Sequence, residues 1–290
     1  MGYFWGFVGV AVFSLTLPMT RLTAGHFDPL FVGIGRAAVA GLLGAIVLGV
    51  TRSPWPVGRD LFRLGLVALG LVGFGVFTSF AMQTLPSSHG AVVIGLLPLA
   101  TAVAGSLMAK ERHGPLFWIA GLFGSVCVVG FAFAKSGWRL QAEDLDLFAA
   151  VAMAAVGYAE GGRLSRQFGG WRVISWAVVL ALPVTLPWSL LVLPSDAGIS
   201  LSAWSGFFYT AFMSQFLGFF AWYYGLAKSG IGKVGQIQLL QTFLTVAFGV
   251  AFLSESADLL TLIVAVLVVL SVVLGRMDKA RHPKETSSPS

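Results

Sequence analysis

The stretch from Lys233 to Leu253, KVGQIQLLQTFLTVAFGVAFL, decides how the rest of the chain must be arranged. It is long enough to cross a bilayer as an α-helix, and it carries no charge after its first residue. Residues three, four and seven apart are neighbours on a helix, so its polar side chains form a stripe on one face. The stripe consists of Gln238, Gln241, Thr242 and Thr245. An unpaired amide is costly in hydrocarbon, so this face must meet protein or a wet cavity.

The composition identifies an integral membrane protein. Hydrophobic residues make up 57% of the chain and charged residues only 10%, whereas soluble proteins carry about 25% charge. The apolar runs are about 20 residues long and do not alternate, which favours helices over a β-barrel. The net charge of +6 is explained by orientation signals and anionic lipid rather than by nucleic acid.

Ten segments are long enough to cross a bilayer, so the sequence predicts an all-α polytopic membrane protein. The first span lacks the features of a cleaved signal peptide and is expected to be retained. The polar tail at 278–290 is expected to be disordered and cytoplasmic. The predicted spans are residues 3–22, 29–51, 61–84, 88–109, 115–134, 144–166, 172–193, 202–227, 232–253 and 258–276.

The positions of Lys and Arg predict the orientation. If the N-terminus is cytoplasmic, fourteen of these residues fall on the inner side of the membrane and three on the outer side. The three outer residues are Arg21, Lys135 and Arg139. The positive-inside rule therefore predicts a multi-pass protein with both termini in the cytoplasm.

The two halves of the chain resemble each other. A shift of 144 residues aligns Leu96, Thr101, Gly105 and Glu111 with Leu240, Thr245, Gly249 and Glu255. Each half holds five spans, and an odd number inverts the second copy, as in many secondary transporters. The predicted domains are two inverted five-helix repeats, at 1–139 and 140–277, followed by the tail. The substrate site of such a fold lies between the repeats near the membrane midplane.

Local motifs extend the resemblance to one family. The first half contains Ser14-Leu15-Thr16-Leu17-Pro18, Arg36, Pro98 and the Glu111 junction. The second half contains Tyr158-Ala159-Glu160-Gly161-Gly162-Arg163-Leu164-Ser165-Arg166, then Gly169-Gly170-Trp171 and Leu182-Pro183. With a glutamate after spans four and nine, the chain resembles the drug/metabolite transporter superfamily of the EamA type. The second set of motifs is similar to the bacterial exporters of aromatic and other neutral amino acids.

This resemblance implies an exporter of the bacterial inner membrane, with a central cavity lined by spans one, three, four, six, eight and nine. Its expected partners are a small-molecule substrate and the lipid bilayer, without nucleic acid, and the oligomeric state stays open. The chain has no H-E-x-x-H, G-x-S-x-G or P-loop motif, and its single cysteine, Cys127, supports no disulfide framework or thiolate metal site. We therefore expect no enzyme activity, cofactor or metal.

Polar and aromatic side chains within the spans are the predicted substrate contacts. Amides donate and accept hydrogen bonds without net charge, which suits a zwitterion, and aromatic walls suit an apolar or aromatic side chain. Bonding between helices is the alternative role of the amides, and packing or lipid contact that of the aromatic rings. The predicted lining residues are Thr16, Thr20, Phe77, Ser79, Phe80, Gln83, His89, Pro98, Tyr158, Gln215, Gln238, Gln241 and Thr242.

Ionisable residues inside spans are candidates for proton or charge binding. Glu160 could carry a proton or bind an amine, or could form a structural pair with Arg163. Arg36 could hold a substrate carboxylate, or could bond to a helix end or a loop carbonyl. His89 titrates near neutral pH and could relay protons, or could be a satisfied histidine at the membrane interface.

Prolines and junction glutamates are expected to shape the helices. Pro18 and Pro98 lie inside spans and remove backbone hydrogen bonds, so both are candidate gate or hinge positions, with a static kink as the alternative. Glu111 and Glu255 are expected to bond to the amide ends of the helices that follow them, where negative charge is favourable.

These features predict a secondary transporter that exports neutral or aromatic amino acids and related metabolites by alternating access. The absence of an ATP-binding motif leaves a gradient to drive any uphill transport, and proton coupling and facilitated diffusion both stay open. One alternative is an exporter of the same fold with cationic or other cargo, which would need an accessible acid such as Glu160. The other is a non-transporting membrane scaffold or channel.

Reporters at the two chain ends test the predicted topology. An even number of spans places both ends on one side, so a reporter that works only in the cytoplasm should be active at either end. The measurement is reporter activity in cells that express each fusion separately. Activity at one end alone would mean an odd number of spans and would rule out two inverted five-span copies.

Overall fold

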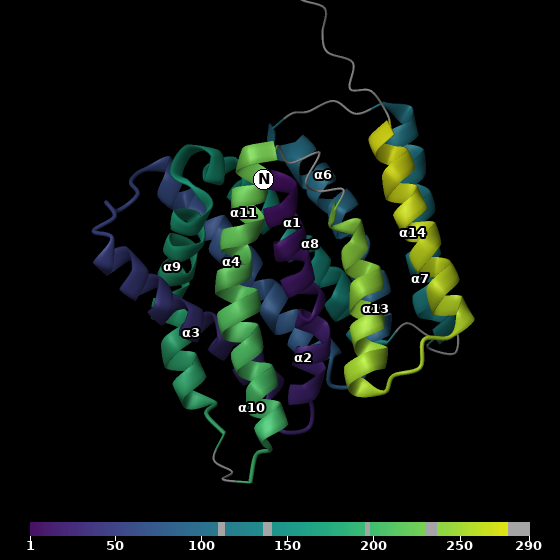
Figure 1. The fold of residues 1–290 in the computed structure, drawn as a ribbon, viewed down its shortest axis with the longest axis horizontal. Helices are drawn as coiled ribbons and strands as arrows, with labels where there is room; N and C mark the ends of the chain where they lie inside the picture. Colours follow the sequence, from purple (N-terminus) through teal and green to yellow (C-terminus); the bar gives the residue numbers. More distant parts are fainter. Residues whose placement is uncertain (110–113, 136–140, 195–197, 230–236, 278–290) are drawn as a thin grey trace, which may run out of the picture.

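All regular structure in the described part of the chain is helical, which confirms the predicted all-α membrane fold. The computed structural model describes residues 1–109, 114–135, 141–194, 198–229 and 237–277. Glu111 and the tail at 278–290 lie outside these residues. Figure 1 shows the helices standing side by side, with the chain beginning at the upper end of the bundle.

The first half of the chain contributes seven of the helices that the structure describes. They are α1 (Gly2–Ser14), α2 (Thr16–Thr23), α3 (Pro29–Val50), α4 (Arg59–Ala81), α5 (Ser87–Ile94), α6 (Leu97–Ala109) and α7 (Pro115–Lys135). The second half contributes α8 (Ala142–Phe168), α9 (Gly170–Leu191), α10 (Leu201–Phe208), η1 (Tyr209–Leu217), α11 (Gly218–Ser229), α13 (Leu239–Leu253) and α14 (Leu259–Met277).

Each of the ten predicted spans overlaps helix in the described residues, and residues 232–236 of the ninth span lie outside them. Six helical segments in the described residues are long and apolar enough to cross a membrane: Gly2–Thr23, Pro29–Val50, Arg59–Ala81, Ser87–Gly105, Ala142–Phe168 and Gly170–Leu191. Shorter apolar helices cover the fifth, ninth and tenth spans: Trp118–Phe131, Leu239–Leu253 and Leu259–Ser271. The eighth span consists of α10, η1 and α11, which follow one another without a break in the helix.

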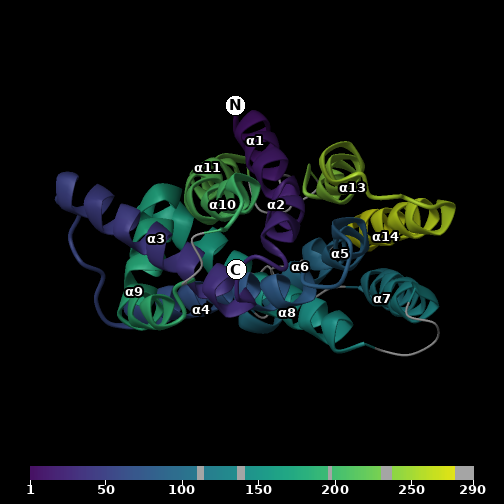
Figure 2. The same ribbon diagram turned by 90° about the horizontal axis from the view of Figure 1, so that it is seen from below.

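The packing of the helices is symmetric when the two halves are exchanged. The most extensive contacts join α4 to α8, α3 to α9, α1 to α11 and α7 to α14. The second span of the first half, α3, pairs with the second span of the second half, α9, and the two fifth spans, α7 and α14, pair in the same way. The contact of the third span of the first half with the first span of the second half (α4–α8) has its counterpart in the contact of α11 with α1. Figure 2 shows α3 and α9 at one end of the molecule and α7 and α14 at the other, so the remaining spans lie between them.

The first and fourth spans are each broken near a proline. α1 gives way to α2 at Leu15, and α5 gives way to α6 at residues 95–96. Pro18 has no N–H group, so the carbonyl oxygen of Ser14 loses its helical partner. The hydroxyl of Thr245 donates to that oxygen at 2.9 Å. One member of the polar stripe on the ninth span is therefore used to pair this backbone group.

The middle of the eighth span is a π-helix of nine residues, η1. Its turns are wider than those of an α-helix, and such segments are frequent at functional sites. The hydroxyl of Tyr209 at its start donates to the carbonyl oxygen of Val12 at 3.0 Å, which holds it against the end of α1.

Glu255 caps a helix of the other half of the chain, which corrects the expectation that it bonds to the helix that follows it. Its carboxylate accepts from the Ser87 N–H at 2.7 Å, from the Ser87 hydroxyl at 2.9 Å and from the Ser88 N–H at 2.9 Å. These groups begin α5. The following helix, α14, is capped instead by Asp258, which accepts from the N–H and hydroxyl of Thr261.

Replacing Glu255 with alanine is expected to destabilise the fold, because two backbone N–H groups and one hydroxyl lose a charged partner. The expected loss is about 1–3 kcal/mol, measured as a lower melting temperature of the protein in detergent. Glu143→Ala, which removes an acid from the first turn of α8, is the matched control. Equal effects of the two substitutions would show that general charge loss, not the cap on α5, explains the change.

Candidate functional site

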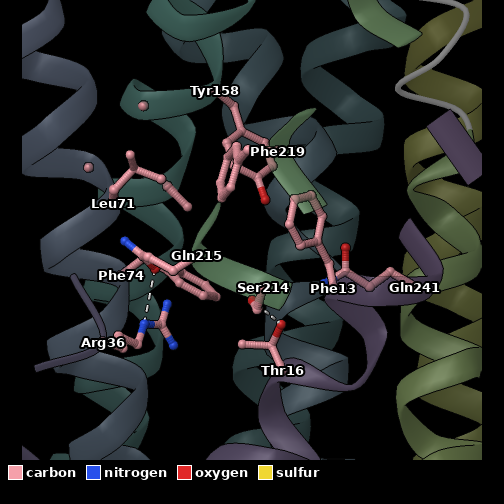
Figure 3. A pocket seen from close by; sticks show the side chains of 13 residues that line it. Phe13, Thr16, Arg36, Leu71, Phe74, Tyr158, Ser214, Gln215, Phe219 and Gln241 are labelled. Carbon is pink, nitrogen blue, oxygen red and sulfur yellow. Dashed lines mark hydrogen bonds between the residues drawn. The ribbon is translucent and has the colours of Figure 1, made fainter. Parts of the chain in front are cut away.

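The candidate site is a small buried cavity of about 20 Å³ between the two halves of the chain. Figure 3 shows its side chains pointing toward one another from helices of both halves. The lining residues are Phe13, Thr16, Arg36, Gly70, Leu71, Phe74, Ala154, Gly157, Tyr158, Ser214, Gln215, Phe219 and Gln241. They come from spans one, two, three, six, eight and nine. The family resemblance implied span four, but among the described residues span two takes part instead, through Arg36.

A close crossing of α4 and α8 forms one wall of the cavity. A Cβ atom on Gly70 would lie 2.6 Å from the Met153 carbonyl oxygen and 2.8 Å from the Gly157 Cα. Only glycine permits this approach, because any larger residue would push the two helices apart. The crossing brings Ala154 and Tyr158 of α8 next to Leu71 of α4 at the cavity.

Aromatic rings form a second wall. The ring centroids of Phe13 and Phe219 are 4.9 Å apart, and those of Tyr158 and Phe219 are 5.8 Å apart. Trp222 lies behind them, 5.9 Å from Tyr158 and 6.3 Å from Phe13. Such rings offer flat apolar faces against which an aromatic or bulky ligand packs.

Arg36 supplies the charge of the cavity and is hydrogen-bonded to the neutral side chain of Gln215. The Nε atom of Arg36 donates to Oε1 of Gln215 at 3.0 Å, and its guanidinium carbon lies 5.7 Å from the centre of the Phe74 ring. A Cβ atom on Gly75 would lie 2.9 Å from the same Nε atom, so glycine leaves the space that the guanidinium group occupies. Arg36 and Gln215 are each only 1% exposed.

Three polar atoms in the cavity are buried without a hydrogen-bond partner. They are Nη1 of Arg36, Nε2 of Gln215 and Oε1 of Gln241. Unpaired buried polar groups are costly and call for an explanation, of which a ligand that pairs with them is one. The hydroxyls of Thr16 and Ser214, by contrast, bond to each other at 2.7 Å.

Five of the residues predicted from the sequence border this cavity: Thr16, Arg36, Tyr158, Gln215 and Gln241. The other members of the polar stripe are buried in protein as expected, but they lie outside the cavity. Gln238 is 4% exposed, and Thr242 lies against Gly95 at the break of the fourth span. Pro98 follows that break and does not line the cavity.

Five predicted lining residues near the ends of the first and third spans lie outside the cavity: Thr20, Phe77, Ser79, Phe80 and Gln83. The hydroxyl of Thr20 donates to the Thr16 carbonyl oxygen, and that of Ser79 donates to the Gly75 carbonyl oxygen. Gln83 accepts from the N–H of Gly25. Phe77 is half-buried and Phe80 is exposed, and neither reaches the cavity.

The remaining ionisable candidates pair outside the cavity. Nε2 of His89 lies 2.8 Å from Oδ1 of Asp144, and both side chains are buried. Glu160 lies 3.4 Å from Nε of Arg163, which is the structural pair considered from the sequence. Among the described residues, no group of three His, Cys, Asp or Glu could hold a metal ion.

Eight lining residues were not identified from the sequence: Phe13, Gly70, Leu71, Phe74, Ala154, Gly157, Ser214 and Phe219. Most are apolar residues in apolar helices and carry no local signal. Ser214 is different, because it is a polar residue next to Gln215 in the middle of the eighth span and carries the same signal as its neighbour.

The chain is similar to known transporters. A solved crystal structure that is 19% identical has the same fold, with a TM-score of 0.66 over 94% of this chain and 97% of that chain. The uncharacterized transporter YdeK of Bacillus subtilis is 43% identical over 95% of this chain and 96% of its own length. The aromatic amino acid exporter YddG of Ancylobacter novellus is 24% identical over 85% and 88%. The model of the EamA-like transporter family matches residues 1–133 and 142–276, and the chain therefore belongs to that family.

Proposed function

We propose that this transporter exports neutral or aromatic amino acids and related carboxylated metabolites across the bacterial inner membrane by alternating access. The observation that carries the proposal is the buried cavity, where unpaired polar atoms of Arg36, Gln215 and Gln241 face a wall of aromatic rings. A carboxylate suits the guanidinium and amide donors, and an apolar side chain suits the rings. The aromatic amino acid exporter among its relatives supports the same substrate class.

The charge of the cavity argues against cationic cargo. Arg36 is the one charged side chain among the described lining residues, and it would repel a cation. Glu160, the acid that cationic cargo would need, pairs with Arg163 outside the cavity. The described lining holds no carboxylate that could take up a proton, which supports export driven by the gradient of the substrate itself.

A counterflow experiment distinguishes the proposed carrier from a channel. Proteoliposomes loaded with unlabelled L-phenylalanine should transiently accumulate labelled L-phenylalanine, because a carrier exchanges the two through one site. Saturation with rising substrate concentration is expected as well. Uptake that neither saturates nor overshoots would contradict alternating access.

Gln241→Ala should lower the rate of counterflow by about two- to tenfold, the effect of losing one hydrogen bond to the substrate. The matched comparison is Gln238→Ala, which removes the same amide from the N-cap residue of the same helix, outside the cavity. It should keep near wild-type rates, and both variants should give wild-type yields of folded protein. If the two variants transport equally well, Gln241 is not a substrate contact.

A further inference from the structure

We propose that the cargo preferred by this cavity is a net anion, in which a carboxylate joins an apolar or aromatic body without an α-ammonium group beside it. The inference rests on the proposed function, because it names the charge of the cargo that the same cavity carries. It replaces the expectation of a zwitterionic substrate with that of a carboxylated metabolite, and three features of the cavity support it.

The first feature is a pair of donors arranged for a carboxylate. Arginine side chains only donate hydrogen bonds, so the bond from Arg36 forces the Gln215 oxygen toward Arg36 and leaves the Gln215 amino group as a second donor. Nη1 of Arg36 and Nε2 of Gln215 are both buried and without a partner. The two oxygens of a carboxylate can accept from two such donors at once, and the charge of the guanidinium strengthens the bonds.

The second feature is the unbalanced charge of Arg36. Its guanidinium stays protonated in proteins, it is 1% exposed within a membrane span, and its bonded partner Gln215 is neutral. No carboxylate is found among the described lining residues. A bound monocarboxylate would bring the net charge of this lining to zero, whereas a zwitterion would leave the positive charge in place.

The third feature is the position of the remaining acceptor. In an α-amino acid the ammonium group is attached to the carbon next to the carboxylate, so a carboxylate held by Arg36 brings the ammonium close to the guanidinium. Like charges placed together are unfavourable. Figure 3 shows Arg36 and Gln215 on one side of the cavity and the unpaired Gln241 amide on the other, where it cannot offset that repulsion.

Gln241 instead suits a hydrogen-bond donor at the far end of the cargo. The rings of Phe13, Tyr158 and Phe219 lie beside the path between the two polar ends. A flat body between a carboxylate and a distal hydroxyl or N–H group would pair with all three unpaired atoms of the cavity.

Three compounds that share a phenylethyl group test the inference. The full chain in proteoliposomes is given labelled 3-phenylpropionate, the des-amino form of phenylalanine, with L-phenylalanine and phenethylamine as competitors. We expect 3-phenylpropionate to bind roughly tenfold more tightly than L-phenylalanine, and phenethylamine to compete least, because like-charge contacts weaken binding.

Gln215→Glu places an acid beside Arg36 and supplies the missing negative charge within the protein. We expect it to weaken binding of 3-phenylpropionate about tenfold or more, with the preference shifted toward L-phenylalanine. Arg166→Gln removes one positive charge from an exposed position on α8 and should change the affinity less than about twofold. A normal melting temperature of each variant confirms that it has folded.

The outcomes separate this inference from the proposed function. Tighter binding of L-phenylalanine than of 3-phenylpropionate overturns the anion preference and leaves amino-acid transport standing. Binding of 3-phenylpropionate without transport of L-phenylalanine supports the inference and removes amino acids from the proposed function. If none of the three compounds binds, both fall. An equal loss of affinity in Arg166→Gln and Gln215→Glu would assign the preference to overall charge and overturn the role of the cavity.

Discussion

A backbone carbonyl that has lost its helical partner determines where the site lies. Pro18 cannot donate a hydrogen bond, so the Ser14 oxygen in the middle of the first span needs a partner from elsewhere. Hydrocarbon supplies none, and an unpaired backbone group there is costly. The hydroxyl of Thr245 meets this need and joins the ninth span to the break in the first. Thr16 and Gln241, one from each of these spans, border the cavity that results.

The same requirement explains how the two halves of the chain hold each other. The carboxylate of Glu255 pairs with the first amides of α5, and the hydroxyl of Tyr209 pairs with the Val12 carbonyl oxygen. Each bond joins a side chain of the second half to a backbone group at the start or near the end of a helix of the first half. Close packing of α4 on α8 at Gly70 adds dispersion contacts along their crossing. Polar groups at helix breaks and helix ends thus determine how the helices are placed, and small residues determine how closely two helices can pack.

The electrostatics of the cavity follow from a single buried cation. The Arg36 side chain extends from the second span and packs against Gly75. It donates a hydrogen bond to the Gln215 oxygen and lies near the Phe74 ring. The wide turns of η1 present both Ser214 and Gln215, neighbours in sequence, to the same cavity. Within the described lining, Arg36 has only neutral partners, which is the basis of the proposed anionic cargo.

The sequence by itself determined the membrane class, the helical spans and the family, because apolar length, charge placement and short motifs are local properties of the chain. It also identified five lining residues, since a polar or charged group stands out in an apolar span. Only the tertiary structure decided which candidates meet at the cavity. His89 turned out to pair with Asp144, and Glu255 to cap α5 rather than α14. Those partners come from helices far apart in the sequence, and their meeting depends on how whole helices pack, which no local pattern specifies.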